Sequence, residues 1–311
     1  MVVLETKETS MDSTRRQMML AAGAALFGPR LLPALGANPT SLAPKKVLFF
    51  TKSSGFIHSV VARKGDQPAF AETILTKIGK EHGFEVVASK DGTMFDPSQI
   101  GQWDAFVFMT TGNLTKPGLD QQPPMSEAGL SAFFDAIEGG KGFVGLHCAT
   151  DTYVAHRGQN GIDPYIKLIG GHFAGHGDQQ VARIEIADPK FPGASEFGSG
   201  SFELKDEWYG QKYLGDDLHV ILTQTTEGMK GKDYQRGNFP ETWARTQGKG
   251  RVFYTSMGHR EDVWENPKFQ GLLLGAMSWA TGLVDADVTP NVAKVTPDYR
   301  EVSRPAAKKV G

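Results

Sequence analysis

The chain has 311 residues, 40% of them hydrophobic and 22% charged, and its formal net charge at pH 7 is −2. This length and composition are typical of a globular protein with a sizeable core. The near-neutral charge excludes the basic surface of a nucleic-acid-binding protein, and the single cysteine, Cys148, excludes an intramolecular disulfide.

The first 37 residues have the order of an export signal. Arg15 and Arg16 precede the apolar run Met18 to Phe27, and small residues at 34–37 offer a place where a signal peptidase could cut. The apolar run is shorter than the roughly 20 residues of a membrane-spanning helix. We therefore expect residues 1–37 to be a twin-arginine (Tat) signal peptide, and the mature protein to be periplasmic without membrane insertion.

A linker at residues 38–44 is followed by one domain, which we expect to span residues 45–285. Its first half contains four short apolar stretches that we predict to be strands: Val47 to Thr51, Phe84 to Ala88, Asp104 to Thr111, and Gly142 to His147. Between them, helices are predicted at Pro68 to Lys80 and at Ser126 to Glu138, where apolar residues recur at helical spacing.

The second half of the domain is more mixed, with long connections rich in glycine and proline. Its predicted elements are strands at Val181 to Ile186, Val220 to Thr223 and Val252 to Ser256, and a closing helix at Pro267 to Thr281. The connections 112–125 and 188–201 are long enough to be candidate lids. Residues 286–311 are polar and lack a hydrophobic period, which indicates a flexible, loosely packed tail.

The pattern of these elements predicts the fold class. Continuous apolar strands that alternate with amphipathic helices are typical of a parallel sheet covered by helices on both faces. We therefore predict an α/β protein, with its ligand site at the edge where the strands end.

Polar side chains follow several of the predicted strands. His58 follows the first strand, Asn113 the third, His147 and Asp151 the fourth, and His259 the last. Because the carboxyl ends of parallel strands meet at one edge of a sheet, these side chains are expected to share a cleft. The alternative for each histidine is a local hydrogen-bonding role at the end of its strand.

Two further segments could reach the same cleft. One contains His172 and His176, whose spacing resembles a pair of metal ligands, although the glycines between and after them argue against a helix and against a zinc-protease motif. The other is the run Asp206-Glu207-Trp208-Tyr209. Its acids could instead cap a loop, and its aromatic residues could instead belong to the core.

The segment from Gly142 to Asp151 resembles the strand and tight turn that carry a nucleophile in glutamine amidotransferases. Those enzymes place a cysteine at the turn in the pattern Gly-x-Cys-x-Gly. Here Gly145 aligns with the first glycine, so His147 occupies the nucleophile position and Cys148 comes one residue late. A residue one position later points to the opposite face of a strand, so we do not expect cysteine catalysis.

Five motifs in series resemble the ThuA-like (trehalose utilisation) family. They are Lys46 to Lys52 with Gly55 to His58, Gly142 to Tyr153, Leu168 to Phe173, Asp206 to Tyr209, and Gly250 to His259. The resemblance runs from about Lys45 to Gly282. The chain departs from the family pattern at Cys148, where a small residue is usual, and at Gly177, where a proline is common.

The resemblance implies a fold and a biochemical setting. The fold would be a flavodoxin-like, class I glutamine-amidotransferase-like three-layer sandwich with a mainly parallel central sheet, in which the amidotransferase nucleophile has been lost. Family members resemble partners of sugar oxidoreductases in pathways that pass through 3-keto-glycosides. The substrate would therefore be a carbohydrate or keto-sugar, and no nucleotide cofactor is expected.

These observations lead to the hypothesis of a keto-sugar isomerase, lyase or hydrolase. The expected catalytic residues are His147, His58, His259 and Glu207. His147 would be the base or a metal ligand, His58 and His259 would polarise the carbonyl directly or through a metal, and Glu207 would be the acid to the leaving oxygen. The expected substrate-binding residues are Asn113, Asp151, His172, Trp208 and Tyr209. The expected metal ligands are His147, His172, His176 and His259, which would suit zinc, nickel, iron or manganese. The alternative is a non-catalytic sugar-binding or partner-docking protein.

Overall fold

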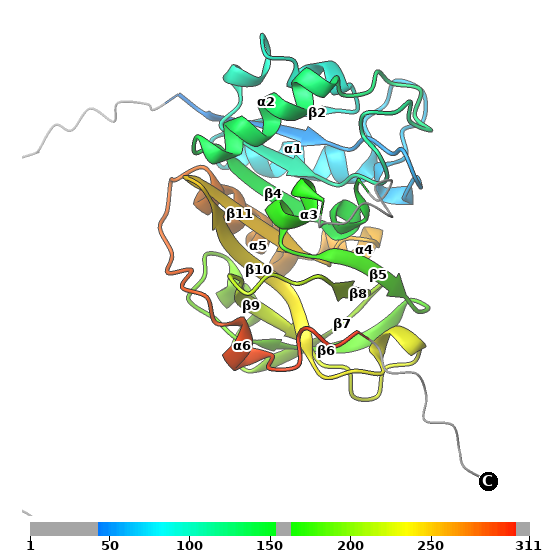
Figure 1. Ribbon diagram of the computed structural model, residues 1–311, viewed down its shortest axis with the longest axis vertical. Helices are drawn as coiled ribbons and strands as arrows, with labels where there is room; N and C mark the ends of the chain where they lie inside the picture. Colours follow the sequence, from blue (N-terminus) through cyan, green and yellow to red (C-terminus); the bar gives the residue numbers. More distant parts are fainter. Residues whose placement is uncertain (1–42, 154–162, 303–311) are drawn as a thin grey trace, which may run out of the picture. The chain divides into compact units, whose positions relative to one another are not determined.

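A computed structural model describes residues 43–153 and 163–302. The predicted signal peptide at 1–37 and nearly all of the predicted linker lie outside the described residues. From Pro44 onwards the described chain forms one compact unit. It is built around a nine-stranded sheet with the order β2-β1-β3-β4-β11-β10-β9-β6-β7 (Figure 1).

The first five strands of this order are parallel. Three of them are followed by the loops that contain His58, His147 and His259. Their bounds are β1 Lys45–Phe50, β2 Phe84–Ser89, β3 Ala105–Phe108, β4 Gly142–Leu146 and β11 Gly250–Thr255. Strands β3 and β4 are buried along their whole length. This agrees with the continuous apolar runs from which they were predicted.

The other half of the sheet is antiparallel. It consists of β10 Phe239–Gln247, β9 His219–Gln224, β6 Gln180–Ile186 and β7 Ser201–Asp206. A separate antiparallel pair is formed by β5 His172–His176 and β8 Tyr209–Lys212. The predicted α/β class is confirmed, but the sheet is mixed, and β5, β7, β8 and β10 were not predicted.

Helices cover both faces of the sheet. The longer ones are α1 Phe70–Glu81, α2 Glu127–Glu138 and α5 Pro267–Ala280, close to the predicted ranges, and the shorter ones are α3 Pro164–Ile169, α4 Glu261–Glu265 and α6 Val292–Val295. None of the described helices is long and apolar enough to cross a membrane.

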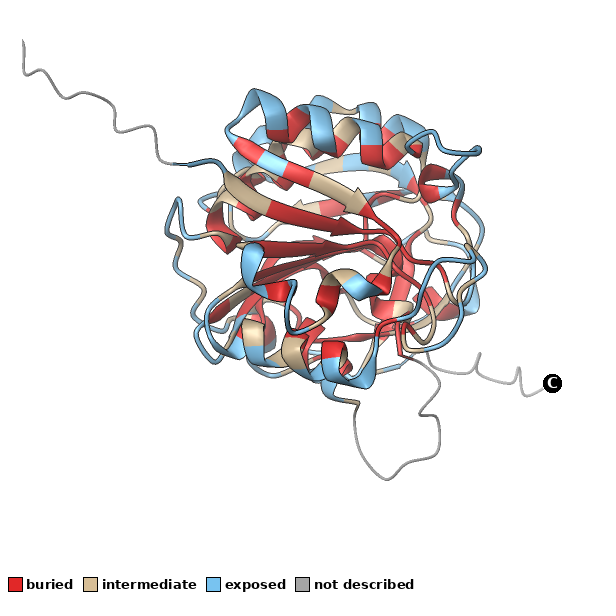
Figure 2. Cartoon of the chain, turned by 90° about the horizontal axis from the view of Figure 1, so that it is seen from above, coloured by how far each residue is buried: buried red, intermediate tan, exposed pale blue. Residues whose placement is uncertain are grey.

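Alternating residues of β1 divide the core into two layers. Val47 and Phe49 pack with α1, α4 and α5, whereas Leu48 and Phe50 pack with α2 and α3. Side chains alternate between the two faces of a strand, so a strand that is covered on both sides must be apolar at every position. Figure 2 shows the resulting arrangement, with buried strands between helices whose outer faces are exposed.

The two connections predicted as lids are both anchored in the described structure. In 188–201, the side chains of Phe191, Ala194 and Phe197 are at most 5% exposed, and the segment packs against α5. In 112–125, Asp120 accepts hydrogen bonds from the buried Lys52 side chain, at 3.1 Å, and from the Ser53 backbone. Neither connection is a free lid.

The predicted loose tail is also wrong for residues 286–302. Val292 and Tyr299 are buried, and the side chain of Asn291 accepts from the Val220 backbone N–H and donates to the Val220 carbonyl. Arg236 donates to the carbonyl of Tyr299 at 2.7 Å. The apolar residues of this segment follow no helix or strand period, yet the buried Val292 and Tyr299 help to dock it beside β9.

Candidate active site

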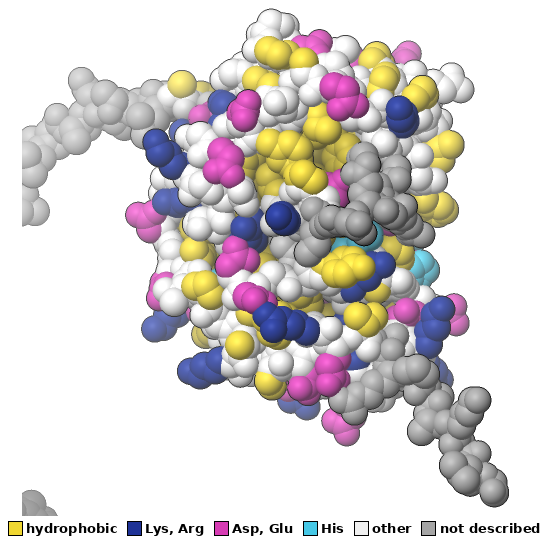
Figure 3. Space-filling view, viewed as in Figure 1, with side chains coloured by type: hydrophobic (Ala, Val, Ile, Leu, Met, Phe, Trp, Pro, Cys, Tyr) yellow, Lys and Arg dark blue, Asp and Glu magenta, His cyan; other side chains and the backbone are white. Residues whose placement is uncertain are grey.

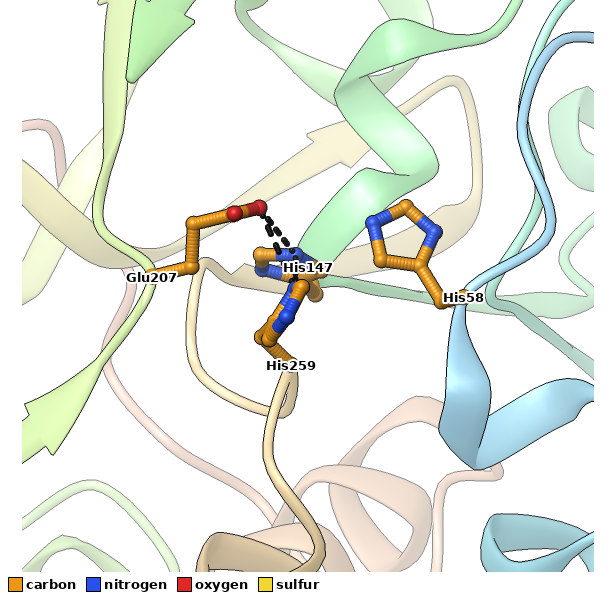
Figure 4. Close-up of side chains that lie close together, drawn as sticks. All are labelled: His58, His147, Glu207 and His259. Carbon is orange, nitrogen blue, oxygen red and sulfur yellow. Dashed lines mark hydrogen bonds and ion pairs between the residues drawn. The ribbon is translucent and has the colours of Figure 1, made fainter. Parts of the chain in front are cut away.

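Four side chains from four distant parts of the chain come together at the carboxyl edge of the parallel strands. They are His58 after β1, His147 after β4, Glu207 between β7 and β8, and His259 after β11. One N or O atom from each lies within 4.8 Å of the others, and Figure 4 shows the side chains pointing toward one another. We call them the four-residue group.

Three of its atoms form a nearly regular triangle. Nε2 of His147 lies 3.3 Å from Nδ1 of His259 and 3.5 Å from Oε2 of Glu207, and the last two atoms are 3.1 Å apart. A divalent metal with bonds of about 2.0–2.2 Å holds neighbouring ligand atoms about 3–3.5 Å apart. Together with His58, this His/Glu donor set could therefore hold a metal ion.

A hydrogen bond to the residue that follows β11 holds the ring of His147 in one orientation. Its Nδ1 lies 2.8 Å from the carbonyl oxygen of Ser256. A carbonyl only accepts, so Nδ1 carries a proton. Nε2 is therefore the nitrogen that faces Glu207 and His259, and it would bind a metal through the lone pair that is freed when its own proton is released. A histidine whose second nitrogen donates to a carbonyl in this way is typical of metal sites.

The backbone of His147 has an unusual conformation. Its φ angle is +42°, in the left-handed region that non-glycine residues rarely adopt. Tyr254 holds this turn by donating from its hydroxyl to the carbonyl of His147 at 2.7 Å. Two residues earlier, a Cβ added at Gly145 would lie 2.8 Å from the end of the buried Ile169 side chain, so a larger residue there requires that side chain to shift. The tight turn that the sequence predicts is thus present, with His147 at its bend.

The turn that carries His259 is fixed by two buried acids. Glu241 accepts hydrogen bonds from the backbone N–H groups of Ser256 and Met257 at 3.0 and 3.1 Å. Asp206 accepts from the backbone N–H of Gly258 at 2.7 Å. Both acids are 0% exposed. Glu241 was not predicted as part of the site, because the mixed polar and apolar segment from Phe239 to Arg245 gives no local signal that its acid is buried.

The charges within the group act on one another. Burial raises the pKa of Glu207, but hydrogen bonds from His147 and His259 and their charges outweigh it and hold this pKa well below the usual range. Burial lowers the pKa of His259, and the neighbouring Glu207 carboxylate more than offsets this. Burial, reinforced by the charges of His147 and His259, lowers the pKa of His58 to about 2, so His58 is a neutral imidazole.

Two further residues border the group. The ring of Tyr209 packs 4.3 Å from that of His147, and its hydroxyl lies 3.4 Å from Nε2 of His58. Nδ1 of His176 lies 3.4 Å from Oε1 of Glu207, the oxygen that is outside the triangle, and 2.9 Å from the carbonyl of Gly177. The His176 side chain is 40% exposed, so it is the accessible histidine at this site.

Other residues predicted for the site lie elsewhere. His172, expected as a metal ligand, is outside the four-residue group and stacks on Tyr213 at 6.0 Å, at the far end of β5. Trp208, expected to stack on a sugar, is 0% exposed and donates from its indole to the carbonyl of Gln180. Successive residues point to opposite sides of an extended segment, so Glu207 faces the site and Trp208 the core.

Three more residues have local environments that bear on their predicted roles. Oδ1 of Asn113 accepts from the backbone and hydroxyl of Thr115, which occupies it within its own turn. Asp151 ends the short helical turn after β4 and is not a member of the group. Cys148 is 1% exposed within the core, and burial raises the pKa of its thiol, which fits the expectation that it is not a nucleophile.

Comparisons with known proteins identify a family from the sequence and a shared fold from solved structures. A family model described as trehalose utilisation (ThuA) matches residues 46–280. A solved ThuA-like protein from Parabacteroides merdae is 18% identical, with a TM-score of 0.58 over 84% of this chain and 96% of that one. One from Bacteroides uniformis is 21% identical, with a TM-score of 0.57 over 80% and 95%. No curated protein matches the chain.

Proposed function

The chain belongs to the ThuA (trehalose utilisation) family, and from this premise we propose that it is a metal-dependent enzyme acting on keto-sugars or 3-keto-glycosides. The observation that carries the proposal is the triangle of His147, His259 and Glu207 atoms with mutual distances of 3.1–3.5 Å. Three buried or half-buried ligands in this geometry, with His58 beside them, fit a divalent metal such as zinc, nickel, iron or manganese.

The ligand assignment follows from the states of the side chains. His147 has its Nδ1 proton engaged by Ser256, and His58 is neutral because burial lowers its pKa. Neutral imidazoles are the form that binds metals. Glu207 keeps its negative charge, which suits a ligand and argues against the role of acid to the leaving oxygen.

A divalent cation bound at this group would act as a Lewis acid on the ketone oxygen of the substrate. The residue best placed to accept a proton is His176. Because Nδ1 of His176 donates a hydrogen bond to the carbonyl of Gly177, Nε2 is left as the acceptor, and the nearby Glu207 carboxylate stabilises the imidazolium that forms. This is the arrangement of a general base supported by a carboxylate.

The chemistry follows from the ketone. A carbonyl at C3 acidifies the hydrogen on C2, so Nε2 of His176 takes that proton and the C–H electron pair forms an enolate. Return of a proton gives an isomer. Alternatively, the enolate re-forms the C3 ketone while a C1–C2 double bond forms and the C1 substituent leaves with its bonding electrons. The ketone itself would come from a dehydrogenase that oxidises the C3 hydroxyl of a glycoside.

Proton NMR in deuterated buffer tests this proposal. The zinc-, nickel- or manganese-loaded protein is given a panel of 3-keto-glycosides, and the C2 hydrogen and the released C1 substituent are followed. We expect loss of the C2 signal with the wild type and with Cys148→Ala. His176→Ala should keep its metal but exchange at least about 100-fold more slowly, whereas His147→Ala should lose metal as well.

The outcomes separate the candidate functions. Release of the C1 substituent identifies a lyase or hydrolase, and exchange without release identifies an isomerase. If the C2 hydrogen survives with every metal and every glycoside, the catalytic proposal fails, and sugar binding or partner docking becomes the better account. If His176→Ala exchanges as fast as the wild type, the assignment of the base is wrong.

A further inference from the structure

Phe56 is a large aromatic residue displayed at the edge of the candidate active site. Its side chain is 59% exposed, and its ring meets the ring of His58 edge-on, with centroids 4.9 Å apart and an interplanar angle of 84°. Exposed hydrophobic side chains are common and carry no weight singly, as the scattered ones in Figure 3 illustrate. The case for Phe56 rests on how its backbone is held.

One threonine fixes the backbone beneath this ring. Oγ1 of Thr111 accepts from the backbone N–H of Phe56 at 2.9 Å and of Gly55 at 3.2 Å, and it donates to the carbonyl of Phe56 at 2.7 Å. Thr111 is itself 1% exposed. The Thr111 hydroxyl thus links the loop after β3 to the loop after β1 through both the N–H and the carbonyl of Phe56.

The two loops also meet backbone to backbone. Gly112 has a φ of +71°, and a Cβ added there would lie 2.6 Å from the backbone nitrogen of Gly55. Only glycine allows this approach without displacement. An aromatic ring on a mobile loop can turn away from any site, whereas the ring of Phe56 is presented from a fixed backbone.

Shielding of His58 accounts for only one edge of the ring. His58 is 3% exposed, and besides Phe56 it is covered by the rings of His147 and His259 and by the hydroxyl of Tyr209. More than half of the Phe56 side chain faces solvent, so most of its apolar surface covers nothing in the described structure. A rigid, uncovered aromatic face beside a catalytic group is suited to stack on a ligand.

We propose that Phe56 is the stacking platform of a sugar subsite beside the four-residue group, and that it selects pyranosides with an unbroken C–H face. This inference rests on the proposed function and names its substrate class more narrowly. The ring that stacks on Phe56 is the unoxidised pyranose that forms the C1 substituent of the 3-keto-glycoside, because a ring with a ketone at C3 has no axial hydrogen there. A β-glucopyranoside has axial hydrogens at C1, C3 and C5 on one face, which forms an apolar patch that can lie on an aromatic ring. Its C3 epimer, the β-allopyranoside, has an axial hydroxyl in the middle of that patch.

Isothermal titration of the metal-loaded protein with methyl β-D-glucopyranoside and methyl β-D-allopyranoside tests this subsite. The wild type should bind the glucoside about tenfold more tightly, which corresponds to about 1.4 kcal/mol. Phe56→Ala should lose this preference by weakening glucoside binding, and Phe56→Tyr should retain it. The control is Leu283→Ala, which removes an exposed hydrophobic side chain elsewhere and should behave as the wild type.

A second variant tests the fixed backbone. Thr111→Val keeps the side-chain volume but removes the three hydrogen bonds to residues 55 and 56, and it should reduce the glucoside preference although the ring is intact. The subsite is overturned if Phe56→Ala keeps the wild-type preference, or if the wild type binds neither glycoside. These glycosides are not keto-sugars, so their binding is measured independently of proton exchange. Failure of the exchange assay would therefore refute the proposed chemistry and leave the subsite untouched.

Discussion

At the scale of single residues, the candidate site depends on how its histidines are oriented. His147 adopts a left-handed backbone conformation and donates a hydrogen bond from Nδ1 to the backbone carbonyl of Ser256. Strained conformations of about 1–3 kcal/mol persist only where surrounding structure enforces them. Here the enforcing structure is the turn after β11, and the buried carboxylate of Glu241 organises that turn.

Glu241 is therefore predicted to be a positioning residue. Glu241→Ala removes the carboxylate that accepts from the backbone N–H groups of Ser256 and Met257 and from the Ser256 hydroxyl, which loosens the turn and shifts the carbonyl that orients His147. Outer residues of this kind alter metal affinity by roughly 10–100-fold. We expect Glu241→Ala to weaken zinc binding by at least about tenfold in a chelator-competition titration.

Two further variants distinguish a positioning role of Glu241 from a general loss of folding. Glu241→Gln retains an acceptor oxygen for the turn and should recover most of the zinc affinity, even if the alanine variant folds poorly. Glu85→Ala removes an exposed acid from β2 and should leave zinc binding unchanged. Equal zinc affinity in the wild type and in a folded Glu241→Ala would refute the role.

At the scale of elements, the start of α1 is joined to the end of β1 by one buried carboxylate. Glu72 accepts from the hydroxyl of Thr51 at 2.6 Å, from Arg63 at 2.8 Å and from the backbone N–H of Ala69 at 2.9 Å. Burial raises the pKa of Glu72, but these hydrogen bonds outweigh it, so the folded-state pKa lies below the usual value.

This linkage predicts a pH-dependent contribution to stability. A carboxyl group with a depressed folded-state pKa stabilises the fold above its unfolded pKa of about 4.3, and this contribution is lost as the pH falls through the folded-state value. Glu72→Gln should therefore be less stable than the wild type at pH 7 by about 1–2 kcal/mol. The difference should shrink below about pH 4 in urea unfolding experiments. A constant difference from pH 7 to pH 3 would contradict it.

At the scale of the whole molecule, we propose that residues 1–37, which lie outside the described residues, direct export of a protein folded in the cytoplasm. Replacing Arg15 and Arg16 by lysine should retain the protein in the cytoplasm, because the pair is the signal that the Tat system reads. Fractionation of cells that express the full chain measures this. The control is Arg30→Lys, beyond the apolar run, which should be exported. Periplasmic protein from the twin-lysine variant would overturn the proposal.

The parallel half of the fold could be predicted from the sequence, whereas in the antiparallel half only β6 and β9 could. Strands such as β3 and β4 are apolar at every position because helices cover both of their faces. Strand β10 contains Pro240 and Glu241, which read as breaks in a strand. It is nevertheless buried from Phe239 to Arg245, because the turn after β11 supplies hydrogen-bond donors to the acid. No local pattern in the sequence reveals those donors.

The sequence by itself determined that His58, His147 and His259 follow strands of a parallel sheet, and therefore that they meet at one edge. Only the tertiary structure decided that Glu207 joins them while His172 does not, and that Trp208 turns into the core. The physical reason is that a side chain's neighbours across a sheet depend on strand order and register. Both are set by packing between segments that are distant in the chain.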